Sequence, residues 1–127
     1  MAQEFATAIN CIDGRTQKPV AEYMQKSFKV DYVDMITEPG PNKILSEGKD
    51  TNIIELLKKK VGISVEKHNS QIIAIVAHYD CAASPENEFV QKEHLHNAVK
   101  VIATWKFPVK KILALWLDNN FMPSVIN

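Results

Sequence analysis

The apolar run at residues 71–77 (QIIAIVA) constrains the fold of this chain more than any other feature. Every residue in the run after Gln71 is apolar, so no polar face alternates with an apolar one. Strands of this kind occur in the middle of parallel sheets, where helices cover both faces. The run therefore predicts a central strand with a helical layer on each side of the sheet.

Strand and helix patterns alternate along the rest of the chain. Short apolar segments predict further strands at residues 4–11, 30–36 and 111–117, and a short edge segment at 122–126. Apolar residues at helical spacing predict helices over residues 19–29, from residue 50 or 51 onward, and from residue 84 to residue 105. Residues 38–42 and 44–49 are expected to form loops.

This alternation predicts a single α/β domain over residues 1–127. We expect a three-layer sandwich around a mostly parallel sheet of four to five strands. The connections between parallel strands should be right-handed.

Charge and composition exclude several classes of function. The chain has 15 acidic and 15 basic side chains, so no net field attracts nucleic acid or anionic lipid. No apolar run approaches the ~20 residues of a transmembrane helix. The N-terminal MAQE lacks the basic start of a secretory signal. We therefore expect a cytoplasmic protein that binds neither nucleic acid nor membrane, with its two cysteines reduced.

Two predicted strands end in reactive side chains. The first strand ends in CIDGR (11–15), and the central strand is followed by HYDC (78–81). Sites in open α/β sheets form where the carboxyl ends of neighbouring strands meet. If these strands are neighbours, Cys11, His78 and Cys81 converge there. Two thiolates and an imidazole suit zinc, and three protein ligands leave a fourth position open, as in catalytic sites.

Asp13 and Arg15 follow Cys11 at alternate positions. In an extended backbone, alternate side chains point to one side, so Arg15 could hold Asp13 through a bidentate pair. A carboxylate held in this way stays ionised and can accept a hydrogen bond from a zinc-bound hydroxide. Other interpretations remain: a surface ion pair, a cysteine that only fills the core, or a Cys11–Cys81 disulfide in an oxidising compartment.

The two motifs together, Cys-x-Asp-x-Arg and His-x-x-Cys, resemble those of the β-class carbonic anhydrases. The resemblance implies that Cys11, His78 and Cys81 bind Zn²⁺. It also implies that Asp13 and Arg15 orient a zinc-bound hydroxide that attacks carbon dioxide and yields bicarbonate, which is the reaction of a lyase. An exposed sheet edge and two tryptophans favour a homodimer or a higher homo-oligomer.

The chain departs from the family pattern around the expected substrate pocket. The segment EPGPN (38–42) stands where the family has Arg-x-Ala-Gly-Asn, so only Gly40 and Asn42 match, and Gly40 is carried over as a pocket residue. Gly14 replaces the usual serine of the first motif. Two alternatives therefore stay open: hydrolysis of a related linear substrate such as carbonyl sulfide or carbon disulfide, and a non-catalytic zinc-binding domain.

Overall fold

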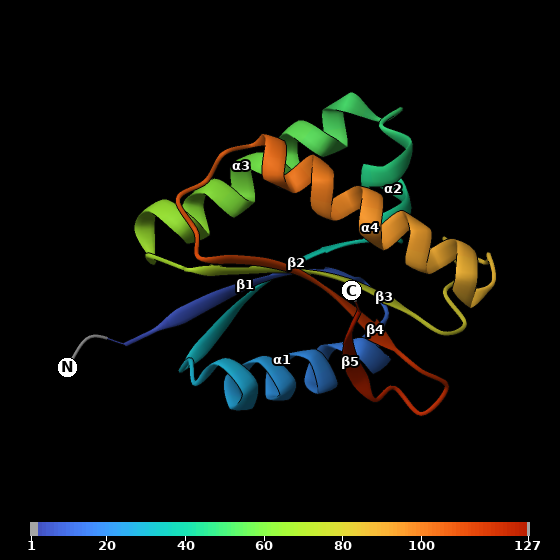
Figure 1. Cartoon of the computed structure of the whole chain (residues 1–127), viewed down its shortest axis with the longest axis horizontal. Coiled ribbons are helices and arrows are strands. Elements are labelled where there is room, and N and C mark those ends of the chain that lie inside the picture. The colour runs from blue at the N-terminus through green and yellow to red at the C-terminus, as the bar shows by residue number, and fades with distance from the viewer. Residues whose placement is uncertain (1–2, 127) are drawn as a thin grey trace.

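The computed structural model describes residues 3–126, in which strands and helices alternate as the sequence predicts (Figure 1). The elements are β1 (Phe5–Cys11), α1 (Gly14–Phe28), β2 (Tyr32–Glu38), α2 (Pro41–Glu47), α3 (Thr51–Lys67), β3 (Ile72–His78), α4 (Glu88–Thr104), β4 (Lys111–Leu117) and β5 (Pro123–Ile126). None of the helices within the described range is long and apolar enough to cross a membrane.

One five-stranded sheet with the order β2-β1-β3-β4-β5 forms the middle layer. Strands β1 to β4 are parallel, and the short β5 runs antiparallel to β4 at the edge. Helix α1 covers one face, and α2, α3 and α4 cover the other (Figure 1). The predicted three-layer α/β sandwich with a mostly parallel sheet is therefore confirmed.

The sheet separates two hydrophobic cores. Along β3, Ile73 and Ile75 belong to the core under α2, α3 and α4, whereas Ala74 and Val76 belong to the core against α1. All four are completely buried. Burial of a large aliphatic side chain contributes about 1.5–3 kcal/mol. The apolar run is thus explained by a strand that is covered on both faces.

The first helix begins earlier than predicted, at Gly14 rather than at Pro19. Asp13 is its N-cap, and the Asp13 carboxylate accepts a hydrogen bond from the Arg15 backbone N–H at 2.9 Å. The expectation that the chain stays extended through Arg15 is therefore wrong. Pro19 lies inside the helix, although proline is best tolerated in the first turn.

The expected loops at residues 38–42 and 44–49 are wrong in part, because Pro41–Glu47 form the short helix α2 and only the residues on either side of it are irregular. Pro41 starts the helix, where a backbone N–H is not needed. Gly40 and Gly48 flank it in left-handed conformations, with φ of 57° and 68°. Leu45 anchors the helix in the core. A helix of two turns is too short to show a clear apolar period.

Candidate metal centre

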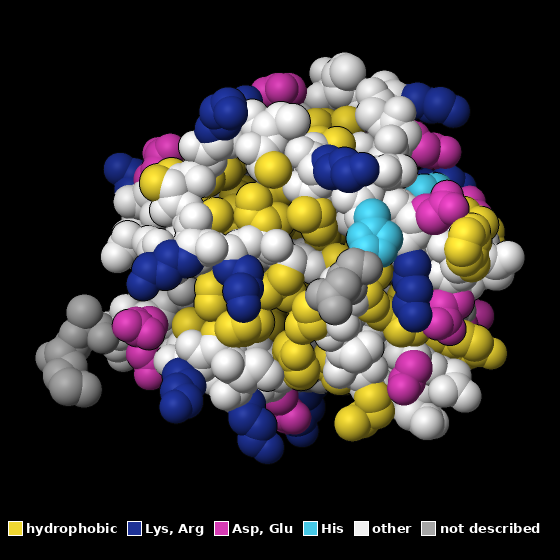
Figure 2. All heavy atoms as spheres, in the orientation of Figure 1, with side chains coloured by type: hydrophobic (Ala, Val, Ile, Leu, Met, Phe, Trp, Pro, Cys, Tyr) yellow, Lys and Arg dark blue, Asp and Glu magenta, His cyan; other side chains and the backbone are white. Residues whose placement is uncertain are grey.

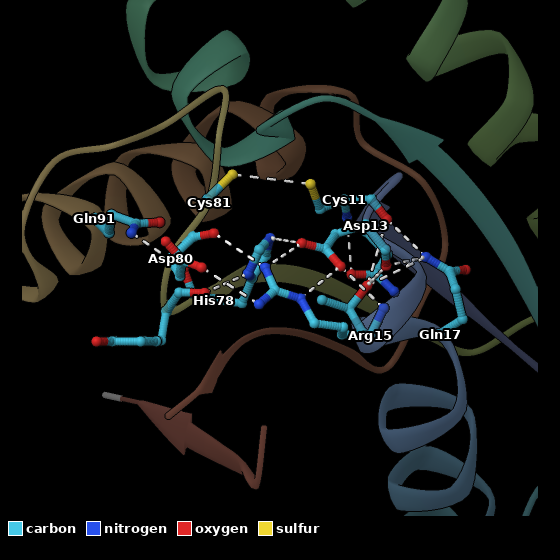
Figure 3. Close-up of polar contacts among 11 residues, drawn as sticks. Cys11, Asp13, Arg15, Gln17, His78, Asp80, Cys81 and Gln91 are labelled. Atoms are coloured by element: carbon cyan, nitrogen blue, oxygen red, sulfur yellow. Dashed lines mark hydrogen bonds and ion pairs between the residues drawn. The ribbon is translucent and has the colours of Figure 1, made fainter. Parts of the chain in front are cut away.

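The predicted ligands meet at the carboxyl ends of two neighbouring strands. Strands β1 and β3 are adjacent and parallel, as expected, with Ile9 opposite Ile75. Cys11 ends β1, His78 ends β3, and Cys81 lies in the loop that follows β3 (Figure 3). Strand β2 lies on one side of β1 and β3 lies on the other, so the strand order reverses at β1. The ligand cluster therefore lies at the topological switch point of the sheet.

The three side chains are buried and close enough to share one ion. The Sγ atoms of Cys11 and Cys81 are 3.8 Å apart (Figure 3). One ligand atom from each of Cys11, His78 and Cys81 lies within 4.8 Å of the others. Neither cysteine forms a disulfide. This arrangement could hold a metal ion.

His78 presents Nε2 to this cluster. Its Nδ1 donates a hydrogen bond to the Tyr79 carbonyl at 2.7 Å, so Nε2 carries the lone pair when the imidazole is neutral. His78 is completely buried, and its Nε2 has no hydrogen-bond partner among the described residues. A buried polar atom without a partner is costly. A bound metal ion would satisfy it, and an imidazole fixed through its other nitrogen is the usual arrangement in metal sites.

The charges at the cluster favour a cation. The hydrogen bond from Cys81, which outweighs burial, lowers the pKa of the Cys11 thiol to about 4. The hydrogen bond to Cys11, together with burial, raises the pKa of Cys81. Burial is the largest single influence and opposes a charged imidazole, but the contacts with Cys11, the Tyr79 carbonyl and Asp13 together raise the pKa of His78. One thiolate thus attracts the protons of two neighbours, and a metal cation would replace those protons.

Asp13 and Arg15 make the bidentate contact that the sequence suggests, but from the first turn of a helix. Arg15 Nε donates to Asp13 Oδ1 at 3.1 Å, and Arg15 Nη2 donates to Asp13 Oδ2 at 2.7 Å. The Arg15 hydrogen bonds lower the pKa of the Asp13 carboxyl to about 2. Asp13 Oδ2 lies 4.0 Å from His78 Nε2. The ionised carboxylate therefore stands beside the cluster of potential ligands.

Sequence reasoning missed three residues that contact this site. Asp80 binds Arg15 through both its carboxylate and its carbonyl, at 3.3 and 3.2 Å (Figure 3). The Phe121 ring lies under the Arg15 guanidinium, with 4.7 Å between Cζ and the ring centroid. Gln91 Nε2 donates to the His78 carbonyl at 3.1 Å. Asp80 lies inside the second motif and could have been noticed. Phe121 and Gln91 carry no local signal.

Gly40 supports the ligand cluster from the start of α2. Its backbone is one of the hydrogen-bond partners that lower the pKa of the Cys11 thiol. A Cβ at this position would lie 3.3 Å from the Cβ of Ala83 and 3.4 Å from that of Ser84. Gly40 therefore packs against the loop that carries Cys81. Its assignment to a substrate pocket stays a prediction.

A mostly parallel sheet with two thiols and an imidazole gathered at its switch point defines an α/β protein with a candidate metal centre. The chain belongs to the family described as "Putative carbonic anhydrase", which matches residues 1–127. The resemblance seen in the two sequence motifs is thereby confirmed. No curated protein matches the sequence.

Solved β-carbonic anhydrases share the fold. Isoform I from the protozoan Trichomonas vaginalis aligns over 98% of this chain and 84% of its own, with 17% identity and a TM-score of 0.59. A tetrameric enzyme from the filamentous ascomycete Sordaria macrospora aligns over 100% and 82%, with 10% identity and a TM-score of 0.54. An enzyme from the fungal pathogen Aspergillus fumigatus aligns over 100% and 76%, with 12% identity and a TM-score of 0.50. At these identities the likeness shows the fold alone.

Proposed function

We propose that this protein binds one zinc ion through Cys11, His78 and Cys81 and catalyses the reversible hydration of carbon dioxide. The observation that carries the proposal is the convergence of two thiols and an imidazole, whose ligand atoms lie within 4.8 Å of one another. It is supported by His78 Nε2, a buried nitrogen with no hydrogen-bond partner in the described part of the chain. Two cysteines and one histidine are a donor set that zinc takes in catalytic sites, with the fourth position open. The family and the fold supply the reaction class.

The roles of the ligands follow from their surroundings. When bound, zinc lowers the pKa of water to about 7 and so supplies a nucleophile near neutral pH. Cys11 and Cys81 would bind as thiolates, and the negative charge of two thiolates suits a divalent cation. His78 would bind through Nε2, because Nδ1 is committed to the Tyr79 carbonyl.

Asp13 would orient the nucleophile rather than remove its proton. A carboxyl whose pKa is about 2 is a poor base at neutral pH, since an effective general base titrates near the working pH. An ionised carboxylate only accepts hydrogen bonds, so Asp13 would align a donor that stands beside His78. Arg15 keeps Asp13 ionised and turned toward the cluster through two hydrogen bonds.

We also propose that two or more copies of the chain associate through the β4–β5 edge of the sheet. Strand β5 pairs only with Ala114–Leu117, so within the described chain the first part of β4 has a strand on its β3 side and none on its outer side. Figure 2 shows hydrophobic side chains across the middle of this face, with charged side chains around the rim. A hollow of about 490 Å³ next to β4 and β5 is lined by Leu113, Val125 and Ile126 among others. An exposed edge with apolar neighbours favours a second copy as its partner.

Zinc analysis and a hydration assay test the proposal together. Full-length protein, purified reduced and zinc-replete, should contain about one zinc per chain by mass spectrometry. Cys81→Ser should lose most of the metal, whereas Ser124→Ala, an exposed serine substitution on β5, should keep it. Stopped-flow measurements should show zinc-dependent hydration of carbon dioxide. Wild-type protein without zinc would refute the proposal.

The same experiment separates the two alternatives. Protein that holds zinc but hydrates no carbon dioxide, and hydrolyses carbonyl sulfide or carbon disulfide, would be a related zinc hydrolase. Protein that holds zinc and acts on none of these substrates would be a non-catalytic zinc-binding domain. Light scattering coupled to gel filtration tests the association, and Val125→Asp should reduce the measured mass to that of one chain.

A further inference from the structure

The guanidinium of Arg15 is held from two opposite sides. Its Nε and Nη2 face Asp13 at the start of α1. Its Nη1 donates to Asp80 Oδ2 at 3.3 Å, and its Nη2 also donates to the Asp80 carbonyl at 3.2 Å. Figure 3 shows Arg15 between these two residues. Four of the five N–H donors of an arginine therefore have a partner from one of two acidic residues.

Asp80 reaches Arg15 because its backbone takes an uncommon conformation. Its φ is 60°, in the left-handed region, which aspartate and asparagine tolerate better than most residues. This conformation lets the carbonyl and the carboxylate of one residue face the same guanidinium. The preceding Tyr79 N–H donates to the Leu117 carbonyl at 2.9 Å, which ties the loop to β4. Uncommon backbone conformations that the surroundings maintain are frequent at functional sites.

The Phe121 ring packs against the face of the Arg15 guanidinium. The ring centroid lies 4.7 Å from Arg15 Cζ and 5.9 Å from the centroid of the His78 ring. Phe121 therefore contacts both the arginine and a predicted metal ligand. A planar guanidinium that rests on an aromatic face and is held at two edges loses most of its freedom to rotate.

We propose that Asp80 is a positioning residue that sets the orientation of Asp13 through Arg15. Asp80 holds one edge of the guanidinium, so the other edge stays aligned with both oxygens of Asp13. Without Asp80, the guanidinium can turn and exchange its bidentate contact with Asp13 for a single bond. Asp13 Oδ2, which lies 4.0 Å from His78 Nε2, would then lose its fixed direction. This inference rests on the proposed function, because Asp13 matters there as the acceptor that orients the nucleophile.

If Asp80 had a purely structural role, its substitution would lower the stability of the protein. The Asp80 side chain is 69% exposed, and exposed ion pairs add little to stability. Removal of its charge should therefore leave the unfolding midpoint almost unchanged. The positioning role predicts that the motion of Arg15 and the hydration rate change while stability and zinc content do not.

Asp80→Asn is the decisive substitution, because asparagine adopts the left-handed conformation at least as readily. It removes the charge and replaces one acceptor oxygen of the side chain by an NH2 donor, while the main-chain carbonyl is kept. Arg15 is the only arginine in the sequence, so its Nε–H gives an unambiguous arginine signal in ¹⁵N NMR spectra. In the zinc-loaded full-length protein, hydrogen exchange at Nε should accelerate roughly two- to fivefold, the range that one exposed ion pair supports. The kcat for carbon dioxide hydration should fall by a similar factor, with KM and zinc content unchanged.

Two further variants make the test specific. Glu88→Gln removes another exposed carboxylate that pairs with a cation, Lys92 at 2.7 Å, and should change neither Arg15 exchange nor kcat. Asp80→Asn introduced into an Asp13→Asn background should cause no further loss of the residual hydration rate, because the residue through which Asp80 acts is already altered.

Unchanged Nε exchange in Asp80→Asn would overturn the inference. An equal loss of rate with and without the Asp13 carboxylate would overturn it as well, because Asp80 would then act by another route. If wild-type protein binds zinc but hydrates no carbon dioxide, the proposed function fails on its own. Faster Nε exchange in Asp80→Asn would still support the role of Asp80 in positioning Arg15.

Discussion

Replacing Gly40 by alanine should destabilise the protein and loosen the loop that carries Cys81. Gly40 has a φ of 57°, a left-handed conformation that costs a residue with a Cβ roughly 1–2 kcal/mol. The added Cβ would also lie 3.3 Å from the Cβ of Ala83. Crowding of this kind in a well-packed region adds about 1 kcal/mol or more. We therefore expect Gly40→Ala to lower the free energy of unfolding by about 2–3 kcal/mol.

Gly48→Ala is the matched control, because it measures the cost of the left-handed backbone conformation alone. Gly48 has a φ of 68°, but a Cβ there would meet nothing within 4 Å. It should therefore cost only the conformational part, about 1–2 kcal/mol. The difference between the two alanine variants, about 1 kcal/mol, isolates the contact between Gly40 and the loop.

Thermal and urea unfolding of the zinc-free, reduced protein measure these values, with the fluorescence of Trp105 and the buried Trp116 as the probe. For a chain of this size, 1 kcal/mol corresponds to roughly 4 °C in Tm. Zinc affinity gives a second readout, because only Gly40→Ala should weaken it. Equal destabilisation by both variants would refute the packing argument, and a Gly40→Ala variant as stable as wild type would refute the backbone argument as well.

Three other predictions concern Arg15 in its pair with Asp13, the Lys43–Glu86 ion pair and the core. Arg15→Lys keeps the charge but loses the planar fork, so carbon dioxide hydration should fall in stopped-flow assays while zinc content stays at the wild-type value. The hydrogen bond from Lys43 lowers the pKa of Glu86 to about 2, below its ordinary value of 4.5, so Glu86 contributes stability above about pH 4.5 that is lost as the pH falls toward 2. The stability difference between wild type and Glu86→Gln in urea titrations of zinc-free protein should therefore shrink between pH 6 and pH 3, and a constant difference would contradict this. Leu115→Ala, at a completely buried position, should cost about 2–5 kcal/mol in the same titrations, whereas Ile12→Ala, at a position 59% exposed, should change stability by less than about 0.5 kcal/mol.

Local patterns were enough to predict the sandwich and the convergence of the three candidate ligands. The run at residues 71–77 has no polar face, and only a strand covered by helices on both sides can bury such a run. Parallel strands end on the same side of a sheet, so reactive residues after two strands are brought to one edge once those strands are neighbours. Both predictions depend on the period of the strand and on the direction of the chain, which neighbouring residues encode.

Local patterns also misled at two places where a short-range signal was read too simply. Pro19 suggested a helix start. The helix instead begins five residues earlier, at Gly14, because the Asp13 side chain caps its N-terminus. Local patterns predict loops at residues 38–42 and 44–49, the first because of its prolines and glycine. Gly40 and Gly48, in left-handed conformations, mark the two ends of α2 instead.

Only the tertiary structure decided what surrounds the Asp13–Arg15 pair. Arg15 meets Asp80 across 65 positions of sequence, and it meets Phe121 from the turn after β4. Neither contact follows from spacing, because each depends on how far the loops after β3 and β4 reach over the sheet edge. The backbone direction at Asp80, with its left-handed φ, decides that its carboxylate turns toward Arg15. The conformation of a loop determines the direction of its side chains at the sheet edge. That conformation depends on packing between segments that are distant in the sequence.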